Sequence, residues 1–141
     1  MIRFRSSRNT ARVRALLDTH SFLWWESDED RLSKSAFDII RDGRNELLVS
    51  VATIWEVAIK YAEGRLVLPT APDLFIAERL RRNRWTELPI DRLHAIRAGS
   101  LPRLHGDPFD RMLIAQAQIE RLTIVTRDAA FDAYDVDVLR C

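Results

Sequence analysis

The sequence predicts one α/β domain built around a short parallel sheet, and three observations lead to this fold class. The chain has 141 residues, which is enough for one domain with a core of its own. Short apolar or β-branched stretches alternate with longer stretches in which apolar residues recur at helical spacing. The uncharged stretch 122–126 directly follows a predicted helix. A helix that leads into a strand covered on both faces is half of a parallel α/β unit.

The predicted strands are short and lie far apart in the chain. They cover residues 15–17, 47–49, 87–90, 122–126 and 136–139. Pro89 lacks a backbone donor and therefore places the third strand at an edge of the sheet. We expect the last strand at an edge as well.

Most of the predicted helices begin after a residue that caps helix N-termini. These residues are Asp18 or Thr19, Ser33, Ser50, Asp91 and Asp107. Pro108 suits the first helical position, where a missing N–H costs nothing. A further amphipathic helix covers residues 73–82, and Gly43, Gly64 and Gly99 mark helix ends.

The composition is typical of an ordinary globular domain, with 47% apolar and 30% charged residues. No apolar run approaches the roughly 20 residues that span a bilayer, so we expect no membrane segment. The single cysteine, Cys141, excludes an internal disulfide and favours a reducing, cytoplasmic location.

Positive charge is concentrated at the N-terminus. Five arginines precede the first acidic residue, and the rest of the chain carries 17 basic residues against 21 acidic ones. This net charge of −4 does not predict a nucleic-acid-binding protein, so phosphate binding must come from a local patch or a bound metal. We expect residues 1–12 to form a disordered basic arm and residues 13–141 to form the domain. Val13 also resembles a natural start, so a mis-assigned start is the alternative.

Four acidic side chains stand out by position: Asp18, Glu56, Asp110 and Asp128. Three of them follow predicted strands or open helices at one edge of the sheet, and Glu56 lies two turns into a helix that leaves this edge. Converging carboxylates repel each other unless a proton or a cation lies between them. An all-oxygen set selects Mg²⁺ or Mn²⁺ over zinc. Without a Gly-rich phosphate loop or a Ser-His-Asp arrangement, such a site favours metal-assisted phosphodiester hydrolysis.

Each acid also has a structural interpretation. Asp18 and Asp107 are suited to cap helices, and Glu56 is suited to pair with Lys60 four residues later. Asp110 stands at the third helical position, where an acid commonly completes a capping box. On the local sequence alone, capping and metal binding are equally favoured for Asp110, and capping is favoured for Asp107.

Three other groups of residues have two interpretations each. The histidines His20, His94 and His105 lack metal-ligand spacing, and we expect surface or structural roles for them. For Arg79, Arg81, Arg82 and Arg84 beside Trp85, a solvated helix face is favoured over RNA contact. For Phe22, Trp24 and Trp25, core packing and a surface for a partner are equally favoured.

The surroundings of the four acids decide between these interpretations, because together they resemble a known family. Asp18 lies in Leu-Leu-Asp-Thr-His and Glu56 in Ile-Trp-Glu-Val-Ala-Ile-Lys. Asp110 lies in Asp-Pro-Phe-Asp-Arg-Met-Leu-Ile-Ala-Gln-Ala, and Asp128 ends Thr-Ile-Val-Thr-Arg-Asp. These motifs, in this order and spacing from Val13 to the C-terminus, resemble the PIN domain, in particular the VapC-type ribonucleases of bacterial toxin–antitoxin pairs.

The resemblance implies a three-layer α/β/α fold with a short, mainly parallel sheet and a Mg²⁺-dependent endoribonuclease, with Mn²⁺ as a substitute. Asp18, Glu56, Asp110 and Asp128 would form the catalytic quartet, with Asp18 and Asp110 as direct metal ligands. Thr126 would orient the site, and Asp107 is a candidate for a cap or an indirect role beside the metal. The implied partners are an RNA substrate, a VapB-like antitoxin whose tail crosses the active-site groove, and a second copy of the chain.

Two other functions compete with this one. An aspartate phosphatase of the haloacid dehalogenase type needs Asp-x-Asp after the first strand, and the chain has Asp18-Thr-His20 there. A catalytically inactive PIN-like scaffold that binds protein or RNA is the non-enzymatic alternative. Such scaffolds usually lose one or more of the acids, and all four are present in this chain.

Overall fold

The computed structural model describes residues 12–141. The predicted basic arm therefore lies, except for Arg12, outside the described residues. Within the described part, five strands form one sheet in the order β4-β3-β2-β5-β6, and every neighbouring pair is parallel. The strands are β2 (Arg14–Leu17), β3 (Glu46–Ser50), β4 (Thr86–Leu88), β5 (Thr123–Thr126) and β6 (Val138–Arg140).

Strand β2 lies at the centre of the sheet. Leu16 pairs with Leu48 of β3 on one side and with Ile124 of β5 on the other. The strand that contains Leu88 and the C-terminal strand form the two edges, as the sequence predicts. All five strands run in one direction, so their carboxyl ends meet at one edge of the sheet.

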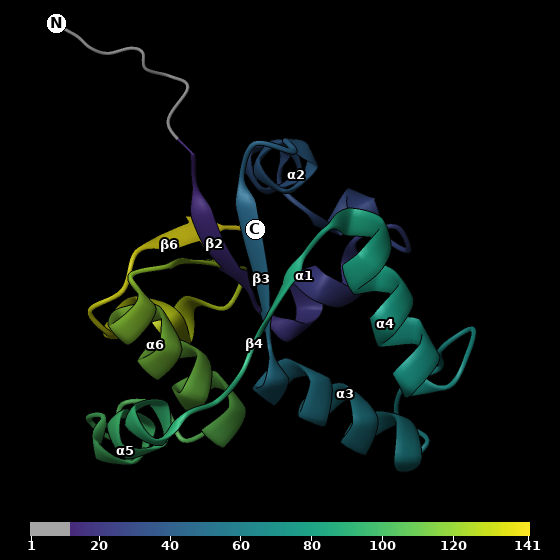
Figure 1. The fold of residues 1–141 in the computed structure, drawn as a ribbon. Coiled ribbons are helices and arrows are strands. Elements are labelled where there is room, and N and C mark those ends of the chain that lie inside the picture. Colours follow the sequence, from purple (N-terminus) through teal and green to yellow (C-terminus); the bar gives the residue numbers. More distant parts are fainter. Residues whose placement is uncertain (1–11) are drawn as a thin grey trace, which may run out of the picture.

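Helices cover both faces of the sheet (Figure 1). One layer contains α1 (Thr19–Trp24), α2 (Lys34–Arg41) and α4 (Pro72–Asn83), and the other contains α5 (Arg92–Ser100) and α6 (Pro108–Glu120). Successive residues of β2 point to opposite layers: Ala15 and Leu17 join the core under α1, and Leu16 joins the core under α6. The predicted three-layer α/β/α architecture is thus confirmed.

Helix α3 (Val51–Ala62) continues directly from β3 and contacts α1, α4 and α6. Its cap is Ser50, whose hydroxyl group accepts a hydrogen bond from the Ala52 amide at 2.9 Å. The predicted caps Ser33, Asp91 and Asp107 are confirmed as well. Two 3-10 helices, η1 (Glu29–Arg31) and η2 (Ala129–Ala133), complete the described chain. None of the described helices is long and apolar enough to cross a bilayer.

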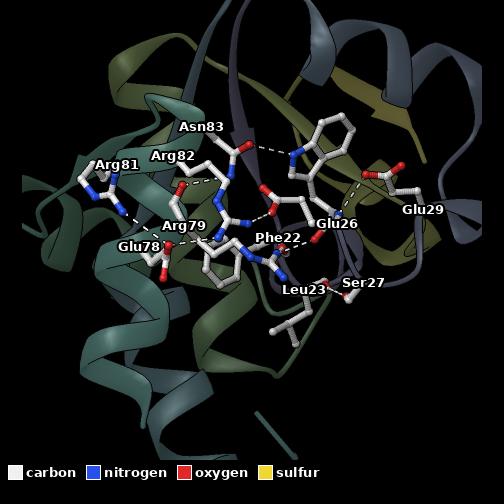
Figure 2. A network of polar contacts seen from close by, with 11 residues as sticks. Phe22, Leu23, Glu26, Ser27, Glu29, Glu78, Arg79, Arg81, Arg82 and Asn83 are labelled. Carbon is white, nitrogen blue, oxygen red and sulfur yellow. Dashed lines mark hydrogen bonds and ion pairs between the residues drawn. The ribbon is translucent and has the colours of Figure 1, made fainter. Parts of the chain in front are cut away.

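A polar network joins the end of α1 to α4 (Figure 2). The guanidinium group of Arg79, a residue that is 8% exposed, donates to the carbonyl oxygens of Phe22 and Trp25. The indole nitrogen of Trp25 donates to Asn83 Oδ1 at 2.9 Å. Arg79 thus supplies donors that the last carbonyl groups of α1 lack within their own helix.

These positions correct one sequence-based expectation and decide another. Arg79 and Trp85 are buried, so the helix face proposed as solvated does not include them. Phe22 is fully buried and Trp25 is 9% exposed, which shows core packing for both, and only Trp24 of the three aromatic residues stays half-buried.

We predict that Arg79→Met destabilises the protein by about 2 kcal/mol or more, because buried carbonyl groups of α1 lose their donors. Arg81→Met is the matched control, since Arg81 lies on the same helix with an exposed side chain. Its change should stay within about 0.5 kcal/mol. Urea unfolding of the three proteins measures both values, and equal stabilities would contradict the role of Arg79.

Candidate metal centre

Asp18 ends the central strand and begins α1. Its carboxylate accepts a hydrogen bond from the Ser21 amide at 2.8 Å, so the predicted cap is confirmed. Its own amide donates to the Val125 carbonyl group at 3.1 Å, which ties it to β5. Asp18 is 5% exposed. Burial raises the pKa of its carboxyl group, and hydrogen bonds from the hydroxyl group of Thr126 and from Ser21 oppose this rise.

Glu56 is held from two sides. Lys60 Nζ lies 2.9 Å from Glu56 Oε2, which confirms the predicted ion pair within α3. The hydroxyl group of Thr19 donates to Glu56 Oε1 at 2.6 Å. Because Thr19 directly follows Asp18, this second bond holds the Glu56 carboxylate against the start of α1.

Asp107 and Asp110 divide the two roles that the sequence left open. Asp107 Oδ1 accepts from the amides of Phe109 at 2.8 Å and Asp110 at 3.1 Å, and Asp107 therefore caps α6. The Asp110 carboxylate turns to another partner, with Oδ2 at 2.8 Å from Nε2 of His105. The interpretation of Asp110 as a capping-box acid is therefore wrong.

Asp128 lies just after β5, at the carboxyl edge of the sheet. Its carboxylate caps η2 through the Ala130 amide at 2.9 Å, and its own amide donates to the hydroxyl group of Thr126 at 3.0 Å. One potential ligand atom each from Asp128, Asp110 and His105 lies within 4.8 Å of the other two. The structure thus brings Asp128 and Asp110 together, from segments that the sheet places side by side.

His105 is the site residue that sequence reasoning missed. The expectation of a surface or structural role is wrong for it, because its ring contacts Asp110 inside the cluster. The only signal in the sequence was its position two residues before Asp107. The expectation holds for His94, which is 1% exposed, completes a capping box with Asp91 and contacts Glu120 at 2.8 Å.

The electrostatics of the cluster favour a bound cation. Burial raises the pKa of Asp110 to about 6, and the negative charges of Asp107 and Glu56 raise it further, while the hydrogen bond from His105 opposes the rise. The charged form of Asp110 is therefore poorly compensated by the protein alone. A divalent cation supplies the missing positive charge, and carboxylate oxygens are the ligands that Mg²⁺ prefers. The residues present fit such an ion.

We predict that Asp110→Asn becomes increasingly more stable than the parent protein as the pH rises from 4.5 to 7.5 in EDTA. The raised pKa means that the folded parent holds a proton more tightly than the unfolded chain, and this contribution is lost as the pH passes about 6. Melting temperatures at several pH values measure the difference. Asp73→Asn, at an exposed position, is the control with a small effect throughout. A difference that shrinks toward pH 7.5 would contradict the prediction.

Comparison with known proteins agrees with this geometry. The family model of the PIN domain matches residues 15–137. The ribonuclease VapC22 of Mycobacterium tuberculosis is 32% identical over 114 residues, which is 80% of this chain and 85% of that protein. The match to the ribonuclease VapC16 of the same organism is 38% identical but spans 56 residues, 40% of each chain.

Two solved structures share the fold. VapBC2 from Rickettsia felis, bound to a DNA fragment from their promoter, superposes with a TM-score of 0.67 at 14% identity, over 91% of this chain and 98% of that one. A toxin-antitoxin complex from Klebsiella pneumoniae has a TM-score of 0.59 at 20% identity, over 89% and 95%. The chain belongs to the PIN domain family and is homologous to the VapC ribonucleases.

Proposed function

We propose that this protein is a Mg²⁺-dependent endoribonuclease and the toxin of a VapBC-type pair. One observation carries the proposal: the buried carboxylate of Asp110, with its raised pKa, lies beside Asp128 at the carboxyl edge of the sheet. Such an uncompensated acid destabilises the protein unless it serves a ligand. The kinship with VapC ribonucleases supports RNA as the substrate.

We assign the residues as follows. Asp18 and Asp110 hold the metal ion, and Asp128 and Glu56 complete the acidic quartet around it. A bound Mg²⁺ lowers the pKa of an attacking water and stabilises charge on the leaving oxygen of the phosphodiester. Thr126 fixes the site by facing Asp18 and accepting from the Asp128 amide. Thr19 and Lys60 hold the Glu56 carboxylate toward α1. Asp107 acts indirectly, as the cap that fixes the start of α6.

The proposed partners follow from the surface. A cavity of about 650 Å³ lies beside α1 and is lined by Trp24, His20 and Phe75, among others. We place the C-terminal tail of a VapB-like antitoxin in this cavity, which begins two residues from Asp18. The toxin-antitoxin complex among the structural neighbours supports such a partner.

We also propose a homodimer in the cytoplasm. The large apolar side chains of Trp55, Leu93, Ile96 and Leu104 are each about 60% exposed, more than single scattered residues require. Trp55 packs edge to face on Phe109 at 5.3 Å, so the starts of α3 and α6 share an apolar surface. A second copy of the chain would cover it.

We predict that Asp110→Asn lowers RNA cleavage by orders of magnitude, because a neutral amide is a poor ligand for a hard cation. The increase in melting temperature that Mg²⁺ gives the parent should shrink as well. Asp18→Asn should relieve the growth arrest that we expect when the parent is expressed without a partner. Single-turnover cleavage, thermal melting and growth curves measure these effects. A variant that cleaves normally would contradict the metal assignment, and a parent that neither cleaves RNA nor arrests growth would favour the inactive scaffold.

We predict that the cognate antitoxin binds with a sub-micromolar dissociation constant and abolishes cleavage. Trp24→Ala should weaken binding by about tenfold or more, because half-buried tryptophans dominate interface energies. Leu74→Ala, at an exposed position of α4, is the control with unchanged affinity. Isothermal titration calorimetry gives the affinities. A fully formed complex with undiminished nuclease activity would rule out this mode of inhibition.

A further inference from the structure

Residues 101–107, here called the site loop, join α5 to α6 and end at the cap of α6. The loop has no regular helix or strand and contains a turn in which the Leu104 amide donates to the Pro102 carbonyl group at 2.9 Å. A segment of this kind depends on long-range contacts for a defined shape. Two side chains supply them.

The first is Arg111, the residue after Asp110. Its Nη2 atom donates to the carbonyl oxygens of Ala98 and Leu101, both at 3.0 Å. Its Nη1 atom donates to those of Pro102 at 2.9 Å and His105 at 3.2 Å. One guanidinium group thus binds four backbone oxygens from the end of α5 and the site loop, which its planar fork of donors allows.

The second is Tyr134, just after η2. Its hydroxyl group donates to the Pro102 carbonyl oxygen at 2.8 Å and accepts from the His105 amide at 2.8 Å. Tyr134 is 7% exposed and packs in the core under α6. Both backbone groups of His105 are therefore bound, its N–H by Tyr134 and its carbonyl oxygen by Arg111.

The fixed backbone places the His105 ring on Asp110. With Nε2 at 2.8 Å from Asp110 Oδ2, the ring occupies one carboxylate oxygen and leaves Oδ1 for a cation. Both side chains are about four-fifths buried, so their mutual orientation is restricted. A partner that orients a ligating carboxylate in this way typically contributes 10–100-fold to metal affinity.

We propose that Arg111 and Tyr134 are positioning residues of the acidic site, which fix the site loop and, through His105, the orientation of the Asp110 carboxylate. The inference rests on the proposed function, because it takes Asp110 as a metal ligand. Neither Arg111 nor Tyr134 contacts an acid of the quartet in the described hydrogen bonds. Their effect on the metal would be transmitted entirely by the site loop.

The test is Mg²⁺ binding to the folded protein by isothermal titration calorimetry, well below the melting temperature. We expect His105→Leu to weaken Mg²⁺ binding about tenfold or more. His105→Gln, which keeps a donor at a similar reach, should stay within about threefold of the parent. Tyr134→Phe removes only a hydroxyl group and should weaken binding at least about threefold. Arg111→Lys should weaken it further, because one ammonium group cannot bind four diverging carbonyl oxygens.

Tyr61→Phe, on the exposed surface of α3, is the matched control and should bind Mg²⁺ like the parent. In cleavage assays, Tyr134→Phe should lower kcat and leave the KM for RNA within about twofold, since the RNA-binding surface is unchanged. A merely structural role would lower the melting temperature and leave the Mg²⁺ affinity of the folded variants unchanged, which would overturn the inference. A parent that binds no Mg²⁺ would instead overturn the proposed function itself.

Discussion

The parallel pairing of β2 with β3 and β5 is the constraint on which the rest of the structure depends. It brings the carboxyl ends of three strands to one edge, where Asp18, the start of α3 and Asp128 follow. Because β2 lies at the centre of the sheet under two layers of helices, Asp18 is buried where its strand ends. The site is thus a direct product of the sheet topology, and α6 adds Asp110 from the side.

This arrangement has an electrostatic cost that the protein only partly offsets. Hydrogen bonds from Ser21 and Thr126 stabilise the Asp18 carboxylate, and His105 stabilises that of Asp110, yet the pKa of both acids stays raised. Lys60 and Thr19 bind Glu56 more completely. The uncompensated charge is therefore concentrated on the two residues that we assign as direct metal ligands. Functional sites commonly sacrifice stability in this way.

The sequence predicted the architecture well because its signals are local. Caps such as Ser50 and Asp107 and the β-branched segment around Ile124 report on their own neighbourhoods, and periodicity gives the covered faces. The four acids came from motifs in a fixed order, and the structure brings Asp110 and Asp128 into one cluster.

What the sequence did not reveal depends on partners that lie far apart in the chain. Arg79 reads as a surface residue of an amphipathic helix, but it binds the Phe22 carbonyl group 57 residues earlier. His105 has no spacing to a second histidine, and its role emerges only when Arg111 and Tyr134 fold the site loop toward α6. Local pattern carries no information on such contacts, because a loop without periodicity takes its shape from tertiary structure.

The most direct test of the central claim is a crystal structure of the protein soaked in Mn²⁺, with the ion located by its anomalous scattering. The account predicts an ion within about 2–2.5 Å of carboxylate oxygens of Asp18 and Asp110. The group formed by Asp91, His94 and Glu120 offers a comparable set of ligand atoms on the far end of α6. An ion bound only at that group, or none at the carboxyl edge of the sheet, would contradict the account.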